Sequence, residues 1–103
     1  MYIPKVLKVG AQRLIIRQSE VVFALDGEPV MGLTKTGTGR IEISTTYHGE
    51  KCPEDSIADT FLHEICHSVS AIYGLDLSET QVIGLAGGLL QVIRDNNLDF
   101  RKS

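Results

Sequence analysis

Short segments rich in Val, Ile and Leu, separated by turn residues, dominate the first half of the chain and predict β-strands. Two of them flank Gly10-Ala11, a pattern typical of a β-hairpin. The turn dipeptide Asp26-Gly27 ends a third segment. We therefore expect residues 1–48 to be rich in β-structure. The expected strands in the first part of this region are residues 3–9, 12–17, 20–25 and, more weakly, 29–33.

Residues 40–46 show the clearest alternation of apolar and polar side chains. Ile41, Ile43 and Thr45 would point to one face of a strand, and the polar residues between them to the other. A loop is expected just before this strand, at 35–39, because two glycines and two threonines occur there. The pattern predicts a strand with one face in contact with solvent.

Apolar residues recur at helical spacing in the second half of the chain. A first helix is expected at about 53–73, because Pro53 suits a first turn and Gly74 suits a C-terminal cap. A second helix is expected at about 78–95, where Ser78-Glu79-Thr80-Gln81 has the form of a capping box. Strands followed by helices indicate an α+β fold. We expect one domain over residues 1–103, with a mainly antiparallel sheet packed against two helices.

One face of the first expected helix is apolar. Phe61, Ile65 and Tyr73 fall within an arc of about 160° on a helical projection and are expected to pack in the core. His63 and His67 fall just outside this arc. The two histidines are therefore expected to border the core, where solvent can reach them.

These histidines belong to the motif His63-Glu64-Ile65-Cys66-His67, an HExxH sequence. Side chains at positions i and i+4 of a helix lie about 40° apart, so both imidazoles can reach one metal ion. Glu64 can then take a proton from a water molecule on that ion. The alternative interpretations are two surface histidines with an unrelated glutamate between them, and a solvated helix acid at position 64.

A catalytic zinc site needs three protein ligands and an open position. Glu79 is our candidate for the third ligand, because it falls within the apolar stripe of the second helix, where a carboxylate needs a partner. It can instead be an acid that complements the helix dipole. Asp76 and His48 are the substitute ligands. For Glu79 to reach His67, the two helices must cross steeply or the first must end early.

Composition limits the other possibilities. The chain of 103 residues has a net charge of −3, and its ten Lys and Arg residues are scattered along the sequence, which argues against nucleic-acid binding as the main role. No apolar run is long enough to span a membrane, and no secretory signal is visible, so a cytoplasmic location is expected. Cys52 and Cys66 are expected to be free thiols and not zinc ligands.

The HExxH motif and the residues after it resemble a known group of proteins. Together with Gly74–Val82, Leu85–Leu89 and Arg94–Asn96, the motif looks like the small HExxH proteins that phages and integrated elements encode. These are similar to a reduced gluzincin peptidase and share features with the IrrE/ImmA and SprT-like groups. The resemblance covers roughly the C-terminal half of the chain.

The resemblance implies a zincin-like core that binds Zn²⁺ through His63, His67 and Glu79, with Glu64 as general base. It also implies that the strand at 40–46, with Ile41, Ile43 and Thr45, pairs through an open edge with an extended peptide. The phage or prophage origin that it suggests would place the protein in the host cytoplasm.

The function that we predict from the sequence is zinc-dependent hydrolysis of peptide bonds. Tyr47 and His48 are candidate donors to the oxyanion of the reaction or to the substrate. The main alternative is a non-catalytic module that contains zinc and binds a protein, for which a closed site with four ligands would be typical. A nucleic-acid-associated protein like the SprT group is a third hypothesis, which the acidic balance disfavours. The sequence predicts no oligomeric state.

Overall fold

The computed structural model describes residues 3–98 and has an α+β fold with three small sheets and two long helices. The expected domain also includes residues 1–2 and 99–103, which lie outside the described residues. In chain order the elements are β1 (Val6–Val9), β2 (Gln12–Ser19), β3 (Val22–Phe23), β4 (Pro29–Val30), β5 (Gly32–Lys35), the 3₁₀ turn η1 (Thr36–Thr38), β6 (Arg40–Ser44), β7 (Thr46–Tyr47), β8 (Glu50–Lys51), α1 (Glu54–Tyr73) and α2 (Glu79–Asp95).

The main sheet has four strands in the order β1-β2-β6-β5 and is mixed. β1 and β2 form the predicted antiparallel hairpin, and β5 and β6 are also antiparallel. β2 and β6, however, run parallel, with Ile16 opposite Ile41. The chain leaves the end of β2, forms the β3–β4 hairpin and β5, and only then returns as β6 beside β2. The expectation of a mainly antiparallel sheet is therefore corrected to a mixed sheet.

The same topology corrects the expected substrate-binding edge. The strand that contains Ile41 and Ile43 is β6, which is hydrogen-bonded to β2 on one side and to β5 on the other. Its backbone has no open edge, and Thr45 lies beyond its end. The free edge next to the helices belongs to β5, which overlaps the weaker strand candidate at 29–33 only at its start and extends into the expected loop at 35–39.

A buried serine joins β6 to the β3–β4 hairpin. Ser44 is 2% exposed, and its hydroxyl accepts a hydrogen bond from the Val22 N–H at 2.8 Å and donates one to the Val30 carbonyl at 2.6 Å. The polar face of the predicted strand is therefore partly covered at its C-terminal end.

Two further elements differ from the expectation. The third strand was expected at 20–25, but β3 is shorter and covers only Val22–Phe23. The β7–β8 hairpin was not predicted from the sequence.

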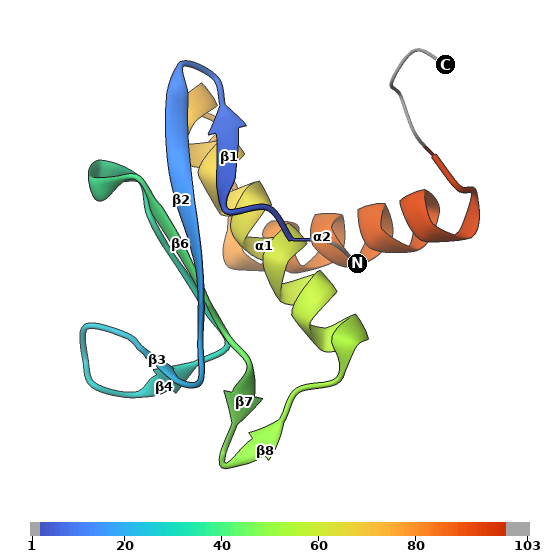
Figure 1. Cartoon of the computed structure of the whole chain (residues 1–103). Coiled ribbons are helices and arrows are strands. Elements are labelled where there is room, and N and C mark those ends of the chain that lie inside the picture. The colour runs from blue at the N-terminus through green and yellow to red at the C-terminus, as the bar shows by residue number, and fades with distance from the viewer. Residues whose placement is uncertain (1–2, 99–103) are drawn as a thin grey trace.

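Both helices lie on one face of the main sheet (Figure 1). The core forms where α1 meets this face, and Tyr73, which we expected in it, is 61% exposed. The end of α1 lies against the turn between β1 and β2, where the Tyr73 ring is near Gly10. The buried residues of this core are Val9, Leu14, Ile16, Ile41, Ile43 and Phe61.

The connection between the helices follows the predicted capping signals. Gly74 adopts a left-handed conformation with φ 67° and ends α1, as expected of a C-terminal cap. Ser78 and Gln81 form both hydrogen bonds of the capping box at the start of α2. α2 then crosses α1 steeply, and its Val82 and Ala86 pack on Cys66 (Figure 1). Neither helix combines the length and the hydrophobicity that crossing a membrane would require, within the described residues.

Candidate metal centre

The helix crossing brings the three predicted ligands together. His63 and His67 lie one turn apart on α1, and Glu79 is the first residue of α2. The Nε2 atoms of the two histidines are 3.1 Å apart. Glu79 Oε1 lies 2.8 Å from Nε2 of His63, and Oε2 lies 3.1 Å from Nε2 of His67. Two imidazole nitrogens and the two oxygens of one carboxylate therefore converge on one small region.

The proximity of these donor atoms fits one metal ion. Nitrogen and oxygen ligands about 2.0–2.1 Å from a tetrahedral zinc ion lie about 3.3 Å from one another. The observed separations of 2.8–3.1 Å, which involve both oxygens of the Glu79 carboxylate, are slightly shorter than this distance. Within residues 3–98, these three side chains are also the one group of His, Cys, Asp or Glu with the proximity that a shared ion requires. His63, His67 and Glu79 can therefore hold a metal ion.

Glu79 occupies a more exposed position than its place in the apolar stripe suggested. Its side chain is 60% exposed, and Ile83, one turn later, is 58% exposed. The buried stripe of α2 is narrower than expected and consists of Val82 and Ala86. The Glu79 carboxylate thus contacts the histidines at the edge of the interface between α1 and α2, where it is exposed to solvent. The substitute ligands Asp76 and His48 are not part of the cluster.

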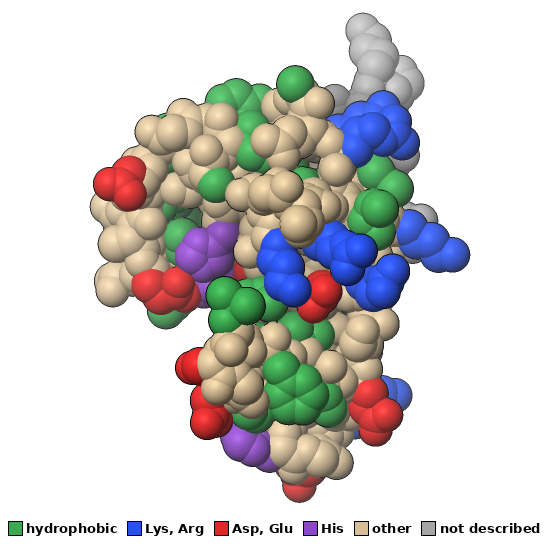
Figure 2. Space-filling model, turned by 90° about the vertical axis from the view of Figure 1, so that its left-hand side faces the viewer, with side chains coloured by type: hydrophobic (Ala, Val, Ile, Leu, Met, Phe, Trp, Pro, Cys, Tyr) green, Lys and Arg blue, Asp and Glu red, His purple; other side chains and the backbone are tan. Residues whose placement is uncertain are grey.

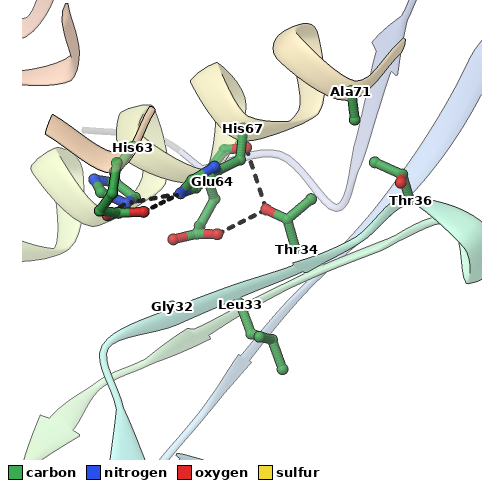
Figure 3. A pocket seen from close by; sticks show the side chains of 9 residues that line it. Gly32, Leu33, Thr34, Thr36, His63, Glu64, His67 and Ala71 are labelled. Carbon is green, nitrogen blue, oxygen red and sulfur yellow. Dashed lines mark hydrogen bonds and ion pairs between the residues drawn. The ribbon is translucent and has the colours of Figure 1, made fainter. Parts of the chain in front are cut away.

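Glu64 lies beneath the histidines and is almost fully buried, with 5% of its surface exposed. The hydroxyl of Thr34 on β5 donates a hydrogen bond to Glu64 Oε1 at 2.7 Å (Figure 3). Burial raises the pKa of the Glu64 carboxyl above its ordinary value, and the Thr34 hydrogen bond and the two histidines oppose this effect. A buried carboxylate with one hydrogen-bonded oxygen is thus held next to the ligand cluster.

The absence of a side chain at Gly32 permits this arrangement. A Cβ atom at this position would lie 2.7 Å from Cγ2 of Thr60 and 3.0 Å from Oε2 of Glu64. β5 can therefore approach α1 closely only with glycine here. An open cavity of about 390 Å³ lies between the strand and the helix, and Glu64 and all three ligands line it.

A second cavity, of about 250 Å³, adjoins the other side of Glu64. Met31 and Gly32 line it from the β5 side, and Asp59, Thr60 and His63 line it from α1. Gly32, Leu33 and Thr34 likewise line the larger cavity (Figure 3). The two cavities therefore follow the free edge of β5 on both sides of the Glu64 carboxylate.

Tyr47 and His48, the candidate donors, lie elsewhere. They belong to the β7–β8 hairpin, are both exposed, and contact each other with ring centroids 4.2 Å apart. Neither side chain lines the two cavities next to Glu64.

Both cysteines, Cys52 and Cys66, are free thiols, as expected. Burial raises the pKa of the Cys66 thiol, which disfavours the thiolate that a zinc ligand would need.

The sequence did not identify two residues of the site, Gly32 and Thr34. Both lie about thirty positions before Glu64. Only the glycine carries a recognisable signal, because an isolated glycine in a strand often marks a close approach of another part of the chain.

The chain was compared with protein-family models, with curated proteins and with solved structures. No family model, no curated protein and no solved structure matches it. What the site does chemically must therefore follow from its own side chains.

Proposed function

We propose that this protein is a zinc-dependent peptidase with a minimal zincin-like core. One observation carries the proposal: a buried glutamate lies directly beside two histidines and a carboxylate whose donor atoms converge. A helix glutamate without a special role is normally solvated, because burial of a charge is costly. The combination of a buried base with an open three-ligand cluster is what metal-assisted hydrolysis requires.

The donor set supports zinc as the metal. Two imidazoles and one carboxylate are the ligands of a well-known class of catalytic zinc sites, and this number leaves a coordination position open. Zinc in such a site supplies Lewis acidity and lowers the pKa of a bound water molecule to about 7. His63 and His67 would bind through Nε2, and Glu79 through its carboxylate.

Glu64 would act as the general base of the reaction. Its Oε1 atom is occupied by the Thr34 hydroxyl, which leaves Oε2 free to accept a proton. The raised pKa of the carboxyl suits this role, because a base is most effective when its pKa is near the working pH. The same carboxyl can later return the proton to the leaving amine.

The free edge of β5 offers a path for the substrate. An extended peptide that adds to this edge would form backbone hydrogen bonds without demanding a particular sequence. It would pass along the two cavities on either side of Glu64, so the scissile bond could lie next to the carboxylate. This role replaces the one that the sequence suggested for residues 40–46.

The exposure of Glu79 favours a second candidate function, a zinc-containing module that binds a protein without cleaving it. The side chain of this ligand is 60% exposed. A partner protein could cover the cluster and supply a fourth ligand, which would make it a structural site. Metal content and turnover together distinguish the two functions.

The first prediction concerns the ligands and the base. The wild-type protein should bind one equivalent of zinc and cleave members of a mixed peptide library. Glu64→Gln should retain zinc and lose at least about 100-fold in turnover, because an amide cannot accept the proton. His63→Ala should lose both zinc and activity. Metal analysis after dialysis and mass spectrometry of the library measure the two properties.

Glu50→Gln, on the exposed β7–β8 hairpin, is a matched control that should change neither property. Stoichiometric zinc without any cleavage by the wild type would replace the peptidase proposal with the binding module. Equal turnover in wild type and Glu64→Gln would exclude Glu64 as the base.

A second prediction tests whether Thr34 positions Glu64. Thr34→Val should lower kcat by about 10- to 100-fold, because a hydrogen bond to a charged group is worth about 1.5–3 kcal/mol. KM and zinc content should not change. Thr34→Ser keeps the hydroxyl and should restore most of kcat. Thr36→Val is the control, since Thr36 lines the same cavity but makes no described hydrogen bond to Glu64. A loss of zinc in Thr34→Val, or an equal effect of Thr36→Val, would contradict the positioning role.

A third prediction concerns the stability of the metal-free protein. Burial raises the pKa of Glu64 in the folded state, so the folded protein binds this proton more tightly than the unfolded chain. The carboxylate therefore destabilises the fold increasingly as pH rises from the ordinary pKa to the folded one. With a chelator present, the Tm of Glu64→Gln minus that of wild type should be small at pH 4 and larger at pH 8. Glu50→Gln should show no such trend. A higher Tm for the wild type than for Glu64→Gln at pH 8 would contradict the prediction that the buried carboxylate destabilises the fold.

A further inference from the structure

The outer face of the main sheet, opposite the helices, collects positive charge. The register sets this arrangement: Ile16 and Ile41 are opposite each other and buried, so their neighbours on β2 and β6 point outwards. The outward positions of all four strands include five Lys or Arg residues. We call these five residues the basic sheet face: Lys8, Arg13, Arg17, Lys35 and Arg40.

The basic sheet face carries half of the ten Lys and Arg residues of a chain whose net charge is −3. One acidic residue, Glu42, lies among them, so the face has a net charge of about +4. Figure 2 looks onto this side of the molecule and shows blue side chains gathered near the centre of the view, with red between them. Cations that are scattered along the sequence are thus concentrated on one surface.

Most of these charges have no acidic partner. Lys35 lies 3.9 Å from Glu42, at the limit of an ion pair. Among residues 3–98, no ion pair is formed by Lys8, Arg13, Arg17 or Arg40, and all four side chains are exposed. Like charges held close together on a sheet repel one another. A polyanion that neutralised them would relieve this repulsion.

We propose that the basic sheet face binds the phosphate backbone of a nucleic acid without sequence specificity. Neighbouring strands lie about 4.8 Å apart, and alternate residues of a strand about 6.8 Å apart, so the cations form an array on the twisted sheet that several successive phosphates can contact. Arginine binds phosphate through a planar pair of N–H donors, and three of the five residues are arginines.

The surroundings of the array favour a phosphate backbone over an acidic protein. The five cations line none of the five best-formed cavities of residues 3–98, and such cavities are where a protein partner would anchor an aromatic or aliphatic side chain. The face also carries no aromatic side chain on which bases could stack. Contacts to phosphates alone predict binding that is weak, independent of sequence and strongly dependent on salt.

Fluorescence anisotropy with labelled oligonucleotides of about 20 residues, single-stranded and duplex, tests the proposal. If the four unpaired cations each neutralise one phosphate, affinity should fall between 50 and 200 mM salt by about 50-fold for the single strand and about 150-fold for the duplex. Arg17→Gln/Arg40→Gln should weaken binding and reduce the slope of log K against log salt by about 1.4–1.8.

Two matched variants accompany this experiment. Lys51→Gln/Arg94→Gln changes the net charge equally but lies on β8 and α2, away from the face, and should leave affinity within about twofold of the wild type. Glu42→Gln removes the acid from the face and should increase affinity several-fold. A gain of affinity cannot result from misfolding, so this variant tests the face even if the arginine variants are unstable.

Several outcomes would overturn the proposal. They are no binding at 50 mM salt, equal losses in the two double variants, or weaker binding by Glu42→Gln. Tighter binding of polyglutamate would show that the occupant is an acidic polypeptide. Tighter binding of vesicles of phosphatidylcholine and phosphatidylserine would assign the face to an anionic membrane. Because no arm of this experiment uses zinc or turnover, its result is independent of the proposed peptidase activity.

Discussion

The close contact between α1 and the edge strand β5 is the constraint on which the site depends. Glycine at position 32 allows the strand to approach, and the Thr34 hydroxyl then reaches the Glu64 carboxylate at 2.7 Å. The same contact buries the carboxylate and gives it a single hydrogen-bonded oxygen. Without it, Glu64 would be a solvated acid on a helix. The position of the proposed base is therefore set by a strand that lies thirty residues earlier in the chain.

The crossing of α1 and α2 supplies the remaining part of the site. An antiparallel pair of straight helices would leave Glu79 beyond the reach of His67. The left-handed Gly74 and the capping box at Ser78 allow a short turn, and the steep crossing places the first residue of α2 over the histidines. Val82 and Ala86 hold this crossing through their contact with Cys66. The packed cluster of Cys66, Val82 and Ala86, with Leu62 and Leu77 against it, thus holds the ligand geometry.

Local signals explain what could be predicted from the sequence. Caps at Gly74 and Ser78, the spacing of the two histidines and the β1–β2 hairpin all depend on residues close together in the chain, and the structure agrees with each. The edge strand was assigned wrongly, because its identity depends on how β6 returns between β2 and β5. The roles of Gly32 and Thr34, and the gathering of scattered cations on one face, depend on the same tertiary pairing. Spacing in the sequence does not contain that information.

The central claim is that two imidazoles and the Glu79 carboxylate bind zinc and leave one position open. X-ray absorption at the zinc edge, on protein loaded with one equivalent of zinc, tests it most directly. The account predicts two imidazole ligands and only nitrogen or oxygen neighbours at about 2.0–2.1 Å, with Glu79→Gln altering this shell. A sulfur neighbour at about 2.3 Å, a shell with one imidazole, or a spectrum unchanged by Glu79→Gln would contradict it.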